Sequence, residues 1–222
     1  MKRIVVAIDG PSGVGKSSVG KAVARRLGLL YIDSGAVYRA VGLKALETGV
    51  WLEDGLQVAR VAREADIRLE GEPGNLKVFL DARDVTLDIR LPGASRAASV
   101  VATLPEVREA VVEKLRAMSR QSGVVMDGRD IGTKVFPDAQ VKIFLEAALD
   151  ERARRRSVDE RVSGRLVTLD QVREEIEERD RRDRERAATP LVKAEDAILI
   201  DTSSMPLDAV IDRVLEIVGS RS

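Results

Sequence analysis

The feature that most constrains this chain is a glycine-rich segment near its start, GPSGVGKS at residues 10–17. A short β-branched run at residues 4–8 precedes it, and apolar residues at helical spacing, Val19, Val23 and Leu27, follow it. A buried strand, a glycine loop and a helix in this order match the pattern G-x-x-x-x-G-K-[ST], whose backbone N–H groups bind phosphate oxygens. The segment therefore predicts an α/β fold that binds a nucleoside triphosphate.

Each part of this loop has an expected role toward ATP. The glycines allow the backbone to turn, Lys16 is expected to reach the β- and γ-phosphates, and the Ser17 hydroxyl is expected to ligate Mg²⁺. The alternative is a glycine-rich turn that merely precedes a helix, and the flanking strand and helix argue against it. The expected ATP-binding residues are Gly10, Pro11, Ser12, Gly13, Val14, Gly15, Lys16, Ser17 and Ser18.

Strand-like and helix-like patterns alternate along most of the remaining chain. This alternation implies a parallel sheet covered by helices on both faces. The further strands are expected at residues 29–32, 123–126, 141–145 and 197–200. Residues ~66 to 90 differ, because apolar and polar residues alternate there with a period of two, which predicts a small antiparallel sheet inserted into the α/β core. The three expected strands of this insert are residues 67–70, 76–80 and 85–89.

The composition excludes several kinds of chemistry. The 222 residues include no histidine and no cysteine, so Ser-His-Asp catalysis, Cys-His catalysis and thiolate metal sites are impossible. The 37 basic residues balance the 37 acidic ones, which argues against a general nucleic-acid coat. No apolar run approaches the ~20 residues of a membrane span, and no signal peptide is visible. We therefore expect a cytoplasmic protein with neither a nucleic-acid partner nor a membrane association.

A first indication of a second, anionic ligand is the segment DSGAVYR at residues 33–39, directly after the second predicted strand. Ligands of open α/β sheets bind just beyond the carboxyl ends of the strands. Ser34 and Tyr38 share a helix face, and Arg39 can turn toward an anion. The alternative is a capped helix that begins at Asp33 or Ser34, with a core tyrosine and a surface arginine.

A second indication is VMDGRD at residues 125–130, which ends a later predicted strand. Asp127 stands where enzymes with this glycine loop place the acid that holds the waters of Mg²⁺. Arg129 and Asp130 follow a glycine and should project from a strand-end loop. The alternative is a surface turn with a local ion pair, since Asp-Gly is common in turns.

A third indication is periodic and lies in the helix that a capping box of Thr168 and Gln171 should begin. Its inward stripe starts with apolar residues and ends with Arg179, Asp183 and Arg186, which keep the same spacing of three and four residues. Charges on an inward face are costly unless they are paired or bound to a ligand. The alternative is that the helix leaves the core there and that water solvates these charges.

Together, these motifs resemble the bacterial-type cytidylate kinases, which are P-loop nucleoside monophosphate kinases. The resemblance covers essentially the whole chain. The residues that carry it are 8–13 (IDGPSG), 33–39, 127–133 (DGRDIGT), 135–139 (VFPDA) and 179–184 (RDRRDR). It implies a single kinase domain over residues 1–222, with a parallel sheet flanked by helices, a small antiparallel β insert and a helical lid. The implied parts are a core of about 1–35, 103–150 and 167–222, a monophosphate-binding region of about 36–102, and a lid of about 151–166.

The resemblance also implies a reaction, the Mg²⁺-dependent phosphorylation of CMP and dCMP by ATP, in a monomeric enzyme. The implied catalytic residues are Lys16, Arg129, Arg152, Arg156 and Arg179. The substrate contacts are Ser34, Tyr38, Arg39, Ser99, Arg108, Arg129, Asp130, Arg179, Asp183 and Arg186; among them Ser99, Arg108 and Asp130 recognise cytosine and Asp183 binds the sugar. Ser17 and, through water, Asp127 are the implied metal ligands. The attacking phosphate oxygen is already anionic near neutral pH, so the missing histidine does not matter.

Three alternatives stay open at this point. The acceptor could be UMP, AMP or shikimate instead. The chain could be a nucleotide-binding regulator without catalysis. It could also bind RNA through residues 151–187, although the 12 arginines there are matched by 11 acidic residues, a pattern typical of a solvated helix surface with ion pairs. A GTPase is not indicated, because no Asn-Lys-x-Asp sequence occurs.

Overall fold

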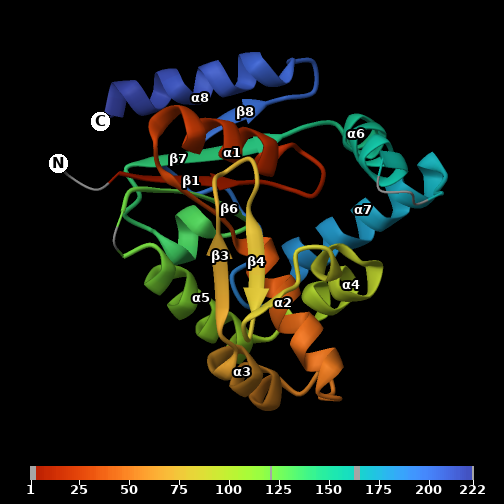
Figure 1. Ribbon diagram of the computed structural model, residues 1–222. Coiled ribbons are helices and arrows are strands. Elements are labelled where there is room, and N and C mark those ends of the chain that lie inside the picture. The colour runs from red at the N-terminus through yellow and green to blue at the C-terminus, as the bar shows by residue number, and fades with distance from the viewer. Residues whose placement is uncertain (1–3, 121, 163–165, 222) are drawn as a thin grey trace.

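The centre of the molecule is a five-stranded parallel sheet with the strand order β2-β6-β1-β7-β8 (Figure 1). The structure, a computed structural model, describes residues 4–120, 122–162 and 166–221. The strands are β1 (Val5–Asp9), β2 (Leu30–Asp33), β6 (Val124–Gly128), β7 (Val141–Glu146) and β8 (Ile198–Asp201). Each begins and ends within two residues of its predicted position, so the prediction of a parallel α/β core is confirmed.

Helices connect these strands and cover both faces of the sheet. Those in the described residues are α1 (Lys16–Leu27), α2 (Ser34–Glu47), α3 (Gly55–Glu64), α4 (Pro92–Val101), α5 (Pro105–Met118), α6 (Leu149–Val162), α7 (Leu169–Glu185) and α8 (Leu207–Arg221). The predicted capping box of Thr168 and Gln171 is present at the start of α7. Gly28 ends α1 in the left-handed conformation, as expected of a helix C-terminus.

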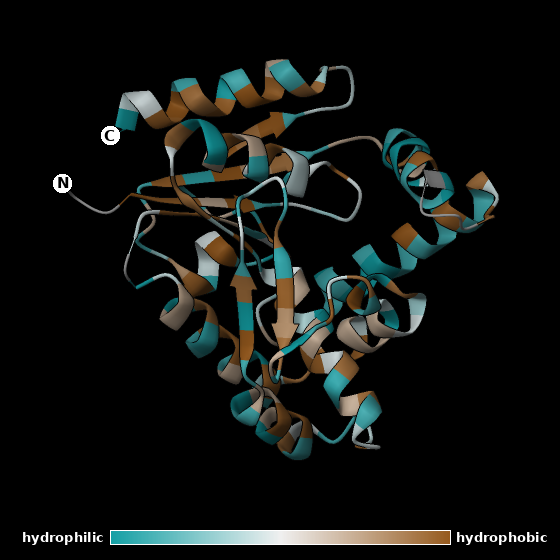
Figure 2. Cartoon of the chain, viewed as in Figure 1, coloured by the Kyte–Doolittle hydropathy of each residue, from teal (hydrophilic) through white to brown (hydrophobic). Residues whose placement is uncertain are grey.

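Alternate residues of β1 pack into two different cores. Val6 and Ile8 lie in a core with α1 and α8, whereas Val5 and Ala7 lie in a core with α2, α3 and α5. Successive side chains of a strand point to opposite faces, so a strand buried on both sides must be apolar throughout. Figure 2 shows this pattern, with hydrophobic strands at the centre and a hydrophilic α7 at the periphery.

The inserted sheet consists of β3 (Ile67–Glu70), β4 (Lys77–Leu80) and the two-residue β5 (Arg83–Asp84). The prediction of a strand at residues 85–89 is wrong, since a short 3-10 helix occupies Asp88–Arg90. Asp81 and Ala82 adopt positive φ angles of 49° and 68°, which turn the chain back directly after β4. The returning strand therefore comes earlier, and Val85 and Ile89 are buried outside any strand, whereas Leu87 is exposed.

Helices α6 and α7 share a small core of their own, formed by Ala153, Val172 and Ile176. They project together from one end of the sheet (Figure 1). The predicted lid of about 151–166 corresponds mainly to α6, and residues 163–165 lie outside the described residues. Across the described part of the chain, no helix combines the length and the apolar character that a membrane span requires.

Acidic residues lie at or next to the carboxyl ends of the neighbouring strands β2, β6 and β1. In the register of the sheet, Asp33 of β2 pairs with Asp127 of β6, and Asp9 of β1 pairs with Gly128. The glycine loop leaves β1 at this edge and leads into the N-terminus of α1. The fold thus brings the glycine loop and the segments at residues 33–39 and 125–130 to the edge where an open α/β sheet binds its ligands.

Candidate active site

The loop between β1 and α1 requires glycine at several points. Gly10, Gly13 and Gly15 have φ angles of 151°, 75° and 96°, which other residues rarely adopt. A Cβ atom on Gly10 would lie 2.3 Å from the carbonyl oxygen of Leu145. The loop can therefore approach β7 closely, and its backbone can turn so that N–H groups gather at the start of α1.

Lys16 lies buried inside this loop, where its Nζ donates a hydrogen bond of 2.5 Å to the carbonyl oxygen of Pro11. Burial lowers the pKa of this ammonium group, and the positive charges of Arg129 and Arg179 lower it further. A buried cation among like charges is destabilised in the absence of an anion. Polyphosphate is a ligand that this environment would stabilise.

Ser17 and Asp127 place two oxygen ligands side by side at the base of the loop. The Ser17 hydroxyl donates to Asp127 Oδ2 at 2.9 Å, and the Tyr31 hydroxyl donates to Asp127 Oδ1 at 2.7 Å. Burial and the neighbouring charge of Asp33 raise the pKa of Asp127 to about 6. A hydroxyl and a carboxylate are donors that suit Mg²⁺, and a cation would stabilise this crowded buried carboxylate. The residues present therefore fit the predicted metal site.

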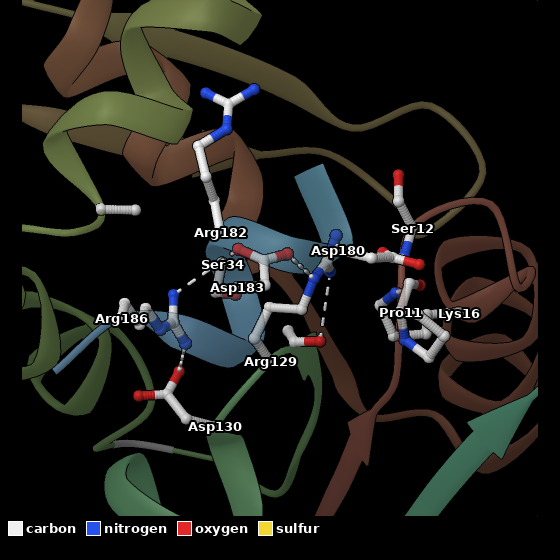
Figure 3. Close-up of polar contacts among 12 residues, drawn as sticks. Pro11, Ser12, Lys16, Ser34, Arg129, Asp130, Asp180, Arg182, Asp183 and Arg186 are labelled. Carbon is white, nitrogen blue, oxygen red and sulfur yellow. Dashed lines mark hydrogen bonds and ion pairs between the residues drawn. The ribbon is translucent and has the colours of Figure 1, made fainter. Parts of the chain in front are cut away.

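Arginine side chains from the end of β6 and from α7 lie near Lys16, and Figure 3 shows Arg129 beside Asp183 of α7. Arg129, which follows β6, donates from Nε to Asp183 Oδ2 of α7 at 2.7 Å. Arg179 is buried beside them; burial and then the charge of Arg129 lower its pKa to about 10. Its Nε finds no hydrogen-bond acceptor among the described residues. A buried guanidinium nitrogen without an acceptor, beside another positive charge, indicates a binding site for an anion.

The segment after β2 combines both of its predicted interpretations. Asp33 is the N-cap of α2 and accepts a hydrogen bond from the N–H group of Ala36 at 3.0 Å. Its carboxylate also pairs with Arg39 at 2.9 Å, and Arg39 Nε is buried without a partner in the described structure. Ser34 donates to the carbonyl oxygen of Asp127 at 2.7 Å. The segment thus caps a helix and adds a hydroxyl and a guanidinium to the charged residues around Lys16, Arg129 and Arg179, a group that is called the cleft below.

A second polar group lies deeper, between α2, α4, α5 and the loop after β6. Arg108 is almost fully buried, donates to the carbonyl oxygen of Ala102 at 2.9 Å and forms an ion pair with Asp130. The Tyr38 ring lies under its guanidinium, 5.6 Å from the ring centre. The hydroxyl of Ser99 is buried with no partner among the residues described. This group offers charged donors, a charged acceptor and an unsatisfied hydroxyl.

The stripe of α7 points inward, as predicted. Val172 and Ile176 are buried, and Asp183 and Arg186 are each 8% exposed, so the alternative of a solvated stripe is wrong. Arg186 Nε donates to the carbonyl oxygen of Thr189 at 2.8 Å. Its NH2 lies 3.9 Å from Asp130 Oδ1, so Arg186 connects the arginines near the loop with the group around Asp130 (Figure 3).

The arginines of α6 point in different directions. Arg156 is partly exposed and pairs with Glu160 at 2.7 Å, and its charge contributes to the lowered pKa of Arg179. Arg154 pairs with Glu151. Arg152 is buried and donates to protein acceptors, among them the carbonyl oxygen of Ala147 at 3.0 Å.

Most of the predicted site residues lie together between the glycine loop and the Arg108–Asp130 pair, where ion pairs connect them. Two of the predicted ATP-binding residues differ in their surroundings. Val14 is buried in the core with α1 and α8, and Ser18 lies exposed in the first turn of α1. Sequence reasoning missed Tyr31, Asp180 and Thr189. Asp180 follows Ile176 by four residues, so the periodicity of α7 contained a signal for it, whereas no pattern distinguishes Tyr31 or Thr189.

A glycine loop at the carboxyl edge of a parallel sheet, facing a cluster of buried arginines, defines a phosphotransferase of the P-loop kinase class. The cytidylate kinase family matches residues 6–220. The curated cytidylate kinase of Pelotomaculum thermopropionicum is 52% identical over 211 residues, which cover 95% of this chain and 93% of that protein. The chain belongs to the cytidylate kinase family.

A second relative agrees with this assignment, and a solved structure shares the fold alone. The curated cytidylate kinase of Caldanaerobacter subterraneus is 50% identical over 213 residues, 96% of this chain and 93% of that protein. A crystal structure of an uncharacterized protein from Eubacterium ventriosum shares the fold with a TM-score of 0.54 at 15% identity, and covers 99% of this chain and 100% of that one. The predicted family, fold class and enzyme class are confirmed.

Proposed function

We propose that this chain transfers the γ-phosphoryl group of ATP to CMP and dCMP, and that it releases ADP with CDP or dCDP. The observation that carries the proposal is the cationic cleft between the glycine loop and the Arg108–Asp130 pair. The charge of Arg129 lowers the pKa values of both Lys16 and Arg179, and the charge of Arg179 lowers that of Lys16 as well. Two anionic substrates that meet in this cleft would relieve that repulsion.

The proposed chemistry needs positioning and charge stabilisation. A phosphate oxygen of the monophosphate attacks the γ-phosphorus in line, and the bond from that phosphorus to the bridging oxygen of ADP breaks. No general base is required, because the second pKa of a phosphate is about 6. Arg129 and Arg179 would bind the transferred group, and Lys16 would stabilise the negative charge that develops on it in the transition state. Ser34, Arg39 and Arg186 are proposed contacts of the acceptor.

Ser17 and Asp127 are the residues that would hold Mg²⁺, Asp127 through water. When bound, Mg²⁺ supplies positive charge to the β- and γ-phosphate oxygens. The chain contributes the placement of its two oxygen ligands, which Tyr31 supports by its hydrogen bond to Asp127. This arrangement supports the proposed cofactor.

The buried group around Arg108 and Asp130 matches the hydrogen-bonding edge of cytosine. Cytosine presents an amino donor at N4 beside acceptors at N3 and O2, so its site must offer an acceptor next to donors. Asp130 or the unsatisfied Ser99 hydroxyl would accept from N4, and Arg108 would donate to N3 or O2. Uracil reverses the polarity at N3 and at position 4, so it would leave buried polar groups unpaired. Asp183 is the proposed contact of the sugar.

We further propose that the lid around α6 and the monophosphate-binding region of about 36–102 close over the bound substrates, and that the enzyme acts as a monomer. Closure would exclude water as a competing acceptor. It would also bring Arg156, whose charge already acts on Arg179, closer to the phosphates. Equal radii of gyration with and without a bisubstrate analogue in X-ray scattering would contradict closure.

The experiment that tests the proposed function is a coupled assay with ATP, Mg²⁺ and a panel of acceptors: CMP, dCMP, UMP, AMP, GMP, dTMP and shikimate. We expect CMP and dCMP to give the largest kcat/KM. A clear preference for another acceptor would refute the substrate assignment. ATP binding without turnover of any acceptor would instead identify a regulator.

A further inference from the structure

The most buried charge of α7 has no place in the proposed reaction. Asp180 is 2% exposed and lies between the glycine loop and α6. The N–H group of Ser12 donates to Asp180 Oδ1 at 2.9 Å, and Arg152 NH1 donates to Asp180 Oδ2. The same Arg152 nitrogen donates to the carbonyl oxygen of Ser12 at 3.0 Å. Ser12 is therefore held at both of its backbone polar groups. Figure 3 shows Asp180 beside Ser12.

Packing reinforces this contact between the loop and the two helices. A Cβ atom on Gly13 would lie 3.2 Å from the carbonyl oxygen of Arg152 and 3.5 Å from Ile176 Cδ1. Gly13 thus lies directly against the first turn of α6 and against the apolar stripe of α7. The bond from Arg152 Nε to the carbonyl oxygen of Ala147 fixes the guanidinium further, so its orientation is set by protein groups.

The geometry of the peptide unit gives this contact a consequence inside the loop. The C=O of Ser12 and the N–H of Gly13 belong to one planar trans peptide, so they point in opposite directions. When the C=O is held against Arg152, the Gly13 N–H must point away from α6. The phosphate-binding groups of such a loop are backbone N–H groups that converge on its interior.

We propose that Arg152 and Asp180 are a positioning pair that orients the Ser12–Gly13 peptide toward the phosphates of ATP. Through the same contacts, the pair connects the loop to the unit of α6 and α7. A movement of this unit would therefore move the phosphate-binding groups of the loop. This role differs from the catalytic role that the family resemblance implies for Arg152. The inference rests on the proposed use of ATP, and it concerns the loop alone.

The competing explanation is that the pair only stabilises the fold, and the two explanations predict different variants. Removing one partner leaves the other charge buried and unpaired, which destabilises strongly, whereas replacing both by apolar residues of similar volume is often neutral. We therefore choose the double variant Arg152→Met/Asp180→Leu, with Arg173→Ala as the matched control. Arg173 pairs with Asp150 and so also connects α7 to α6, at 3.6 Å, but on the exposed surface.

In the double variant we expect the KM for ATP to rise roughly 10- to 100-fold, because a small misplacement of binding groups is sufficient for such losses. The KM for CMP should stay within about twofold, since the acceptor contacts are untouched. The control should match the wild type in both. A double variant that melts close to the wild type and keeps its KM for ATP would overturn the positioning role.

A second measurement needs neither turnover nor a stable double variant. We expect the Ser12 amide of the nucleotide-free wild type to be protected in hydrogen exchange, and Asp180→Asn to lower the affinity for ADP without Mg²⁺ more than Arg173→Ala does. A fast-exchanging Ser12 amide in the wild type would refute the inference. An enzyme that phosphorylates no acceptor at all would refute the proposed function instead. The amide measurement needs no acceptor, so it would still test the positioning role.

Discussion

The cleft and the outer surface of this molecule contain the same charged residue types in opposite environments. In the cleft, the side chains of Arg108 and Asp130 are 4% and 6% exposed. On the surface, those of Arg213 and Glu216 are 55% and 67% exposed. A surface pair contributes about 0–1 kcal/mol to stability, whereas breaking a buried pair costs about 3–5 kcal/mol because one charge is left unpaired.

This difference explains how a chain without net charge can contain an anion-binding site. Among the described residues, many arginines pair with acidic residues near the surface, as Arg154 does with Glu151. In the cleft the arginines outnumber the carboxylates, and the unpartnered Nε atoms of Arg39 and Arg179 lie there. Buried charge retained at this cost indicates ligand binding more strongly than the overall composition does.

The largest effect should follow from the loss of Lys16. We expect Lys16→Met to lower kcat by roughly 10²- to 10³-fold, as for other single groups that stabilise transition-state charge. Initial rates at saturating ATP and CMP measure it. Because burial and neighbouring arginines already lower the pKa of Lys16, the variant should remain folded, and thermal unfolding checks this. A kcat near that of the wild type would show that Lys16 of the glycine loop takes no part in the reaction.

A matched control for the cleft arginines lies on the same helix. Arg182 points away from the cleft in Figure 3 and pairs with Glu178 at 3.3 Å on the surface. We expect Arg182→Ala to leave kcat within about twofold of the wild type, while Arg179→Ala lowers it roughly 10²-fold or more. Equal effects of the two substitutions would show that the comparison between cleft and surface is wrong.

A smaller and more selective effect is expected at the buried pair. Arg108→Leu should lower kcat/KM for CMP by about 100-fold and that for UMP much less, since a donor to cytosine is lost. It should also lower the melting temperature, because Asp130 is left buried without its partner. Parallel assays with both acceptors measure the ratio. An unchanged ratio would mean that Arg108 supports the fold and does not select the base.

The free energy of unfolding should depend on pH through another buried charged residue, Asp9. Asp9 accepts hydrogen bonds of 2.8 Å from the N–H groups of Ile131 and Gly132, and burial raises its pKa from 3.8 to about 6. Between these values the folded state binds more protons than the unfolded state. The free energy of unfolding should therefore fall, by about 3 kcal/mol from this group, as the pH rises from about 4 to 6. Denaturant unfolding at several pH values measures this decrease in the wild type and in Asp9→Asn. The variant should lack the part that comes from Asp9, and an equal decrease in both proteins would contradict the prediction.

The smallest effect should come from the surface pair. Arg213→Ala is expected to change the free energy of unfolding by less than about 1 kcal/mol, and rising salt should reduce the change further. Denaturant titration of the variant and the wild type measures it. A loss comparable to that of Arg108→Leu would mean that burial does not separate the two kinds of arginine.

The parts of the molecule that sequence reasoning predicted are those with local causes. The glycine loop, the strands of the parallel sheet and the capping box at Thr168 each depend on neighbouring residues, and each was found in place. The stripe of α7 was predicted as well, because helical spacing is a local property.

The parts that escaped prediction depend on contacts between distant segments. Tyr31 and Asp127 are 96 residues apart and meet only because β2 and β6 are neighbours in the sheet. Asp180 reaches Ser12 across 168 residues. The third strand of the insert was misplaced because Asp81 and Ala82 both have positive φ angles. Aspartate adopts such angles more often than most residues, but alanine rarely does, so the residue types do not predict this turn.

The measurement that tests the central claim most directly is an internal competition. Equimolar CMP and UMP share one reaction with limiting ATP and Mg²⁺, and the ratio of CDP to UDP gives the ratio of the two kcat/KM values. The account predicts a large excess of CDP, and a marked reduction of that excess in Arg108→Leu. An excess of UDP from the wild type would contradict the assignment of the buried Arg108–Asp130 group to cytosine.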